Sequence, residues 1–178
     1  MNNYQIIIEY DGTKFVGWQF QKNGLSVQEI IQKVLKKLLK KKIIIYGSGR
    51  TDSGVHALGQ SAHFKTKIVI KNINKFLESL NFFLCKHSVS IINIKKKNIK
   101  FHARYNAKKR LYKYLILNRV SPTSLYKKRV WHVKKLIDHK IMKKAARLLV
   151  GKKDFSAFRA ASVSYTHLPA HQTDPYLL

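Results

Sequence analysis

Apolar and polar positions in the first hundred residues follow two periods, one typical of strands and one typical of helices. Residues 4–10 are β-branched and aromatic and end at Asp11-Gly12, which predicts a buried strand followed by a turn. Residues 26–29, Ser-Val-Gln-Glu, have the capping-box pattern of a helix start. The apolar positions that follow fall on one face of a helix, at 27, 30, 31, 34, 35, 38 and 39.

The same patterns predict four further elements before residue 95. Residues 43–46, 61–66 and 89–94 have the composition and alternation of strands, and apolar positions between 73 and 84 repeat at helical spacing. The resulting order is β-α-β-β-α-β. This order is typical of the split βαβ unit of ferredoxin-like or RRM-like domains.

The pattern then restarts after a basic stretch at residues 95–110. Residues 111–118 and 129–133 are predicted strands, and residues 138–150 are a predicted helix with Asp138 at its N-cap. The fold class is therefore α+β, with two split βαβ units of which the second is incomplete. We expect a first domain at 1–100 and a partial second domain at 101–161.

The last 17 residues, 162–178, differ in composition from the rest of the chain. None of the 36 Lys and Arg residues lies there, whereas two of the three prolines do. We expect this tail to be unrelated to the domain before it, and no function is inferred from it.

The net charge of +28 favours a polyanionic partner, because a strong positive potential attracts nucleic acid and speeds encounter with it. The composition offers a second explanation. The chain has 29 Lys against 7 Arg, together with many Ile and Asn residues, as an AT-rich genome would produce. Charge alone therefore points toward nucleic acid without naming a reaction.

Location and redox state follow from what the sequence lacks. It has no apolar run of 18 residues that would span a membrane, and its first residues do not resemble a secretory signal. The single cysteine, Cys85, lies in an apolar stretch and is predicted to be a small core residue rather than a nucleophile. These observations favour a reducing cytoplasm.

Candidate chemistry lies in residues 47–56, where three glycines follow a predicted strand. Glycine lets the backbone turn tightly and approach a ligand closely. The carboxylate of Asp52, beside Arg50, suits nucleophilic or base catalysis because a neighbouring cation favours the charged form. An ordinary tight turn with a surface ion pair would have the same composition, so the loop alone leaves both interpretations open.

Several segments, in order along residues 4–160, resemble the TruA family of tRNA pseudouridine synthases. The strongest is Gly-Arg-Thr-Asp-Ser-Gly-Val-His-Ala at 49–57, and a second is Glu-Tyr-Asp-Gly-Thr-Lys-Phe-Val-Gly-Trp-Gln at 9–19. The others are Ser-Val-Gln-Glu at 26–29, Phe-His-Ala-Arg at 101–104, Arg-Leu-Tyr-Lys-Tyr at 110–114 and Asp-Phe-Ser-Ala-Phe-Arg at 154–159.

The resemblance implies a reaction that isomerises uridine in tRNA to pseudouridine, at positions 38–40 of the anticodon arm. Asp52 matches the family's essential aspartate, and Arg50 matches the arginine that pairs with it and helps displace the target base. Tyr112 matches the tyrosine that packs against that base. Arg104 and Arg110 are the further candidates for substrate binding.

The resemblance also implies a homodimer that needs no cofactor. His56, His63 and His102 lack the spacing of metal ligands, so no metal is expected, and they are predicted to pack in loops or face RNA. Tyr114 is predicted to lie in the core. Family members continue past residue 160, so we expect a poorly folded second unit and weak activity.

Two other functions remain open on the sequence. One is a non-catalytic or degenerate tRNA-binding remnant that keeps a basic groove but lacks a complete active-site cleft. The other is a ferredoxin-like domain that binds some other anion, which leaves the ordered motifs unexplained.

Overall fold

The computed structural model describes residues 1–158, which divide into two compact units. The first unit spans residues 1–108, and the second begins at Lys109. The domain boundary predicted at residue 100 stays a prediction. The compositionally distinct tail, 162–178, lies outside the described residues.

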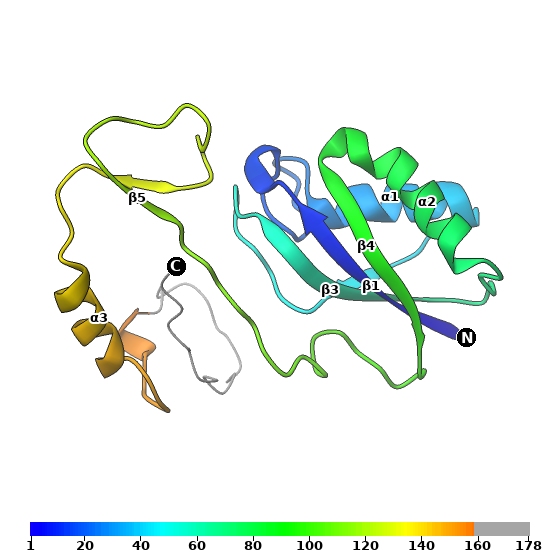
Figure 1. Ribbon diagram of the computed structural model, residues 1–178. Helices are drawn as coiled ribbons and strands as arrows, with labels where there is room; N and C mark the ends of the chain where they lie inside the picture. Colours follow the sequence, from blue (N-terminus) through cyan, green and yellow to red (C-terminus); the bar gives the residue numbers. More distant parts are fainter. Residues whose placement is uncertain (159–178) are drawn as a thin grey trace. The chain divides into compact units, whose positions relative to one another are not determined.

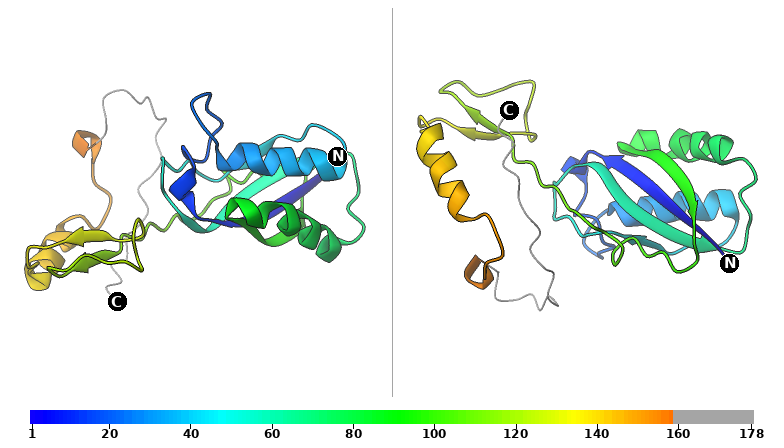
Figure 2. Two further views of the ribbon diagram at one scale, coloured as in Figure 1. Left: turned by 90° about the horizontal axis from the view of Figure 1, so that it is seen from above. Right: turned by 60° about the horizontal axis from the view of Figure 1, so that its bottom comes forward.

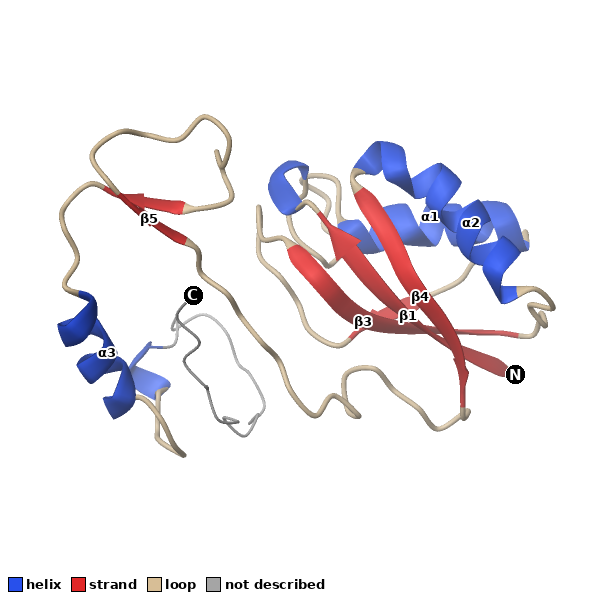
Figure 3. Cartoon of the chain, viewed as in Figure 1, coloured by secondary structure: helices blue, strands red, loops and turns tan. Residues whose placement is uncertain are grey.

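The first unit has the predicted β-α-β-β-α-β order. Its sheet has the strand order β2-β3-β1-β4 and is antiparallel throughout, as in a ferredoxin-like domain. Both long helices cover the same face of this sheet (Figures 1 and 3). The elements are β1 (Asn2–Tyr10), α1 (Val27–Leu39), β2 (Ile45–Gly47), β3 (Ala57–Thr66), α2 (Ile73–Leu84) and β4 (Val89–Lys97), with short 3-10 turns η1 (Gly12–Lys14) and η2 (Cys85–His87).

The pairing of β1 with β3 decides which side chains face the helices. Tyr4 lies opposite Phe64 and Ile6 opposite Ala62, and all four are buried in one core beneath the helices. Directly opposed residues share a face of the sheet, and neighbours along a strand alternate between faces. His63 and its partner on β1 therefore belong to the other face, which neither helix covers.

Both long helices begin at a side-chain cap. At α1, Ser26 Oγ accepts a hydrogen bond from the Glu29 N–H at 3.2 Å, which confirms the predicted start, and the Glu29 carboxylate pairs with Lys33 at 2.6 Å. At α2, Asn72 Oδ1 accepts from the Lys75 N–H at 2.9 Å. Within residues 1–158, no helix combines the length and the apolar character that a membrane span requires.

The prediction that Cys85 belongs to the core is wrong, because its side chain is exposed. The helix α2 buries Leu80 and Leu84, which lie four residues apart on one face. Cys85 is the next residue along and therefore points away from that face.

The second unit contains two short strands, β5 (Ile116–Asn118) and β6 (Trp131–Val133), which pair in parallel. Its helix α3 (His139–Leu148) is capped by Asp138, as predicted. The Asp138 carboxylate accepts hydrogen bonds from the N–H groups of Lys140 and Ile141. Figure 2 shows these elements in yellow-green to gold. The described part of the unit ends in the 3-10 turn η3 (Ser156–Phe158).

The predicted strand at 111–118 is wrong over its first five residues, since only β5 is a strand. Within residues 1–158, no strand pairs with residues 111–115, and a strand without a partner leaves its backbone hydrogen-bonding groups to water. Tyr114 is 84% exposed, so the prediction that it lies in the core is wrong as well. Among residues 109–157, no residue is buried.

Candidate active site

The candidate site is the loop at 48–56, which connects β2 to β3 without regular structure. The first two residues of the loop are fixed by the sheet. The Ser48 N–H donates to the Ser61 carbonyl at 2.7 Å, and Gln60 Nε2 donates to the Gly49 carbonyl at 2.9 Å. The loop therefore leaves the sheet at a defined place.

Thr51, the residue before Asp52, is held by the segment that follows β1. The Trp18 N–H donates to the Thr51 carbonyl at 3.0 Å, and the Tyr10 and Thr51 hydroxyl groups lie 2.8 Å apart. Tyr10 and Trp18 are both 3% exposed. Burial raises the pKa of the Tyr10 phenol, while its hydrogen bond with Thr51 acts in the opposite direction. Tyr10 thus stays a neutral structural contact of the loop.

The two residues after Asp52 are held from the same side. Ser53 Oγ donates to the Phe15 carbonyl at 3.2 Å, and the Gly54 N–H donates to the same oxygen at 3.3 Å. The backbone on both sides of Asp52 is therefore tied to residues 10–18. The motifs at 9–19 and 49–57 are thus in direct contact in the folded unit.

The close approach of these two segments depends on glycine. Gly17 has a φ of +126°, and a Cβ atom there would lie 2.6 Å from the Thr51 carbonyl oxygen. Gly12 faces the Val55 carbonyl so closely that a Cβ atom would overlap it. A side chain at either position would push the segments apart and displace Asp52.

The side chain of Asp52 is exposed, and within residues 1–158 it forms no hydrogen bond or ion pair. A fixed backbone with an accessible carboxylate can bring an anionic oxygen to a substrate with little rearrangement. Arg50 is also exposed, and no ion pair joins it to Asp52 in the described part of the chain. The predicted pairing of these two residues stays a prediction.

Arg104 lies in the same unit, in a short turn formed by residues 102–106. The His102 N–H donates to Asn106 Oδ1 at 2.8 Å, and the Asn106 N–H donates to the His102 carbonyl at 2.9 Å. The Arg104 side chain is exposed and lies beside Tyr105, with the guanidinium carbon 6.0 Å from the ring centre. Its charge is thus available to an anionic ligand.

Tyr112 and Arg110 belong to the second unit, where both are exposed, Tyr112 to 64%. Their predicted roles at the substrate stay predictions.

The three histidines at 56, 63 and 102 have different surroundings. His56 Nδ1 lies 3.1 Å from both the Gly12 nitrogen and an Asp11 carboxylate oxygen, so this ring packs between loop segments. His63 is 1% exposed and contacts His102, with ring centres 4.5 Å apart. Residues 1–158 contain no group of three or more His, Cys, Asp or Glu side chains that could hold a metal ion.

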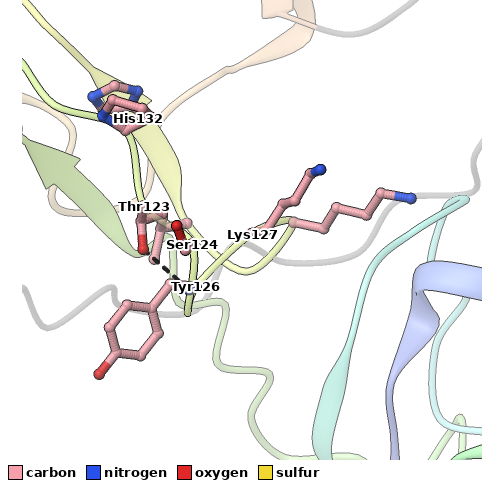
Figure 4. A pocket seen from close by; sticks show the side chains of 8 residues that line it. Thr123, Ser124, Tyr126, Lys127 and His132 are labelled. Atoms are coloured by element: carbon pink, nitrogen blue, oxygen red, sulfur yellow. Dashed lines mark hydrogen bonds between the residues drawn. The ribbon is translucent and has the colours of Figure 1, made fainter.

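A shallow pocket lies elsewhere, in the loop between β5 and β6 (Figure 4). In this loop, the Tyr126 N–H donates to Thr123 Oγ1 at 3.1 Å, and Lys127 and His132 also line the pocket. None of the candidate site residues lines it, and it has no paired carboxylate or other catalytic grouping.

The sequence indicates Asp52, Arg50 and Arg104 as candidates, but it does not indicate the residues that hold the loop around Asp52. The roles of Tyr10, Phe15 and Thr51 depend on contacts between segments about 40 residues apart. A signal was present, since a glycine-rich, aromatic stretch after a strand favours a close backbone contact. The sequence did not indicate which segment it would contact.

The first unit is thus a ferredoxin-like domain whose β2–β3 loop carries an exposed carboxylate on a backbone that is hydrogen-bonded on both sides. A family model described as tRNA pseudouridine synthase matches residues 6–106, which include this loop and the turn with Arg104. The chain belongs to the tRNA pseudouridine synthase family.

Individual relatives agree with this assignment. A tRNA pseudouridine synthase A from Pelagibacter ubique is 54% identical over 162 residues, covering 91% of this chain and 66% of the relative. Proteins of the same name from Anaplasma phagocytophilum and a Thermoanaerobacter species are 44% and 43% identical, over 88% and 93% of this chain and 64% and 67% of their own lengths. The chain spans about two thirds of the length of these relatives.

Proposed function

We propose that this protein isomerises uridine to pseudouridine in the anticodon arm of tRNA, at positions 38–40. The observation that carries the proposal is the exposed carboxylate of Asp52, with the backbone fixed on both sides by Phe15 and Trp18. Membership of the family supplies the reaction, and the net charge of +28 suits an RNA substrate. The protein would act in the cytoplasm as a homodimer.

In the proposed reaction, the bond between N1 of uracil and C1′ of ribose breaks, the base rotates, and C5 bonds to C1′. Asp52 assists the detachment, either by attacking the sugar or by removing a proton from it. A carboxylate suits both tasks, because it is anionic at neutral pH and is a competent nucleophile and leaving group. C5 then loses its proton, which restores the conjugated ring, and N1 gains a proton in place of its bond to C1′, so substrate and product have the same composition.

The remaining site residues would bind and expose the target base. A base inside a helical stem must leave its stack, which costs a few kcal/mol that contacts with the RNA have to supply. Arg50 would help displace the base, and Tyr112 would pack against it. Arg104 and Arg110 would contact phosphate groups, since a guanidinium can form two parallel hydrogen bonds with one phosphate.

The test uses an unmodified tRNA transcript with uridine in the anticodon arm, incubated with the full chain, and measures pseudouridine. We expect Asp52→Asn to lower the single-turnover rate at least about 10³-fold with little change in tRNA affinity, because nucleophiles contribute mainly to the chemical step. Asp138→Asn is the matched control, since asparagine also caps a helix start. Equal rates for wild type and Asp52→Asn would refute the assignment of Asp52.

A second candidate function is a tRNA-binding protein that lacks turnover. The absence of buried residues among 109–157 favours it, because Tyr112 then has no core to hold it against a base. In the same assay, this function predicts that wild type and Asp52→Asn bind the transcript equally and that neither forms pseudouridine.

A further inference from the structure

Residues 98–106 follow β4 and are tied by two buried side chains to the sheet face that the helices leave open. Asn3 Nδ2 donates to the carbonyl groups of Asn98 and Phe101, each at 2.9 Å. His63 Nδ1 accepts a hydrogen bond from the Ala103 N–H at 3.2 Å. Asn3 and His63 are each 1% exposed, so both contacts are shielded from water.

The ring of His63 is enclosed on several sides. It stacks on Tyr46 with ring centres 5.2 Å apart, and it meets the edge of His102 at 4.5 Å. Phe101 packs edge-on at 5.9 Å. These contacts fix the ring plane and therefore the direction in which Nδ1 presents its lone pair to Ala103.

His63 can accept this hydrogen bond only while Nδ1 carries no proton. Burial lowers the pKa of His63 to about 4, and the nearby His102 and Lys65 act in the same direction. A hydrogen bond with the Tyr46 backbone opposes them. The residue opposite His63 on the paired strand β1 is Gln5, which is uncharged. The imidazole is therefore neutral at physiological pH, in the state that the contact requires.

Ala103 transmits this contact to Arg104. Ala103 is 2% exposed, so its N–H has His63 Nδ1 rather than water as its hydrogen-bond acceptor. The Arg104 N–H in turn donates to His102 Nδ1 at 3.2 Å. The backbone from which the Arg104 side chain extends is thus held at consecutive peptide groups.

We infer that His63 is a positioning residue, which fixes the turn at 102–106 so that Arg104 presents its guanidinium to the tRNA. This inference rests on the proposed function of Arg104 as a tRNA contact. His63 itself is buried and does not touch the RNA. It acts through the Ala103 N–H, as a fixed acceptor on the sheet.

The test compares His63→Leu and His63→Asn in the full chain, each alone and combined with Arg104→Ala. Leucine removes the acceptor at similar volume, whereas asparagine keeps an oxygen close to the position of Nδ1. We expect His63→Leu to weaken binding of an unmodified tRNA transcript roughly three- to tenfold, the effect of one hydrogen bond. His63→Asn should restore most of the affinity, and His87→Leu controls for loss of an imidazole in η2.

The double variant separates positioning from general damage. If His63 acts through Arg104, His63→Leu should weaken binding little further once Arg104 is alanine. The same loss of affinity in both backgrounds would overturn the inference, as would binding by His63→Leu that equals wild type.

Amide hydrogen exchange at Ala103 tests the contact without tRNA. Exchange should quicken at least about tenfold in His63→Leu and return toward wild type in His63→Asn, because the amide loses and regains its acceptor. Unchanged exchange would overturn the inference. Failure of wild type to bind tRNA, with faster Ala103 exchange in His63→Leu, would refute the role of Arg104 in tRNA binding while leaving the contact established.

Discussion

The two units of this protein are stabilised in different ways. In the first unit, apolar side chains from four strands and two helices are buried in a single core, and polar contacts then fix the loops at its edge. In the second unit, no residue among 109–157 is buried, and polar contacts join its segments. Asn118 illustrates them, since its side chain bonds the backbone of Val133, Lys135 and Ile137.

This difference bears directly on the candidate site. Asp52 rests on a loop whose neighbours contact buried residues such as Trp18, so the burial of the core also stabilises the loop. Tyr112 lies in a segment without a paired strand among the described residues. Ordering such a segment around a substrate costs conformational entropy that no described contact offsets. The backbone that carries the Asp52 carboxylate is therefore preorganised, and the segment that carries Tyr112 is not.

Truncating one apolar side chain in each unit gives the largest expected contrast. Phe64→Ala should lower the free energy of unfolding by about 3–5 kcal/mol, because Phe64 is fully buried and stacks on Tyr4. Leu148→Ala, at a side chain that is 69% exposed, should change it by less than about 0.5 kcal/mol. Denaturant unfolding followed by Trp18 fluorescence in a Trp131→Phe background measures the first change, and Trp131 fluorescence in a Trp18→Phe background measures the second. Similar losses would show that the second unit has a core as well.

Acidification should lower the free energy of unfolding of the first unit, because His63 is buried as a neutral imidazole. Because the folded pKa of about 4 lies below the usual value near 6.5, the unfolded chain binds more protons between these values. This part of the stability is complete above pH 6.5 and is lost as the pH falls toward 4. Between pH 7.5 and 4.5, we expect the free energy of unfolding to fall by about 2 kcal/mol more in wild type than in His63→Leu. Parallel pH profiles from denaturant unfolding would contradict the burial of a neutral imidazole.

A matched pair of glycine substitutions gives the smallest contrast. In Gly17→Ala, the new Cβ atom would overlap the Thr51 carbonyl oxygen on a backbone that has positive φ. We therefore expect the free energy of unfolding to fall by about 1–2 kcal/mol and pseudouridine formation to fall measurably. Gly151→Ala also has positive φ, but its Cβ atom would meet nothing within 4 Å. For Gly151→Ala we expect the free energy of unfolding to fall by about 1 kcal/mol and pseudouridine formation to stay unchanged. Equal effects on turnover would show that Gly17 does not position Asp52.

Much of the first unit could be predicted from sequence because its signals are local. The capping pattern at Ser26 and the helical spacing after it depend on residues within a few turns. The second unit was predicted less well. Residues 111–115 have strand-like composition, yet a strand requires a partner, and composition does not supply one.

For the site, the sequence by itself determined which residues are candidates for the chemistry: Asp52, Arg50 and the other positions that resemble the family's motifs. Only the tertiary structure decided how the first unit supports them. It placed the carbonyls and N–H groups of residues 15–18 against the loop, and it placed His63 beneath Ala103. These contacts join residues about 40 positions apart, and chain folding rather than local preference brings such residues together. The motif at 49–57 therefore indicates Asp52 as a candidate, whereas the fixed backbone around its exposed carboxylate is a property of the folded domain.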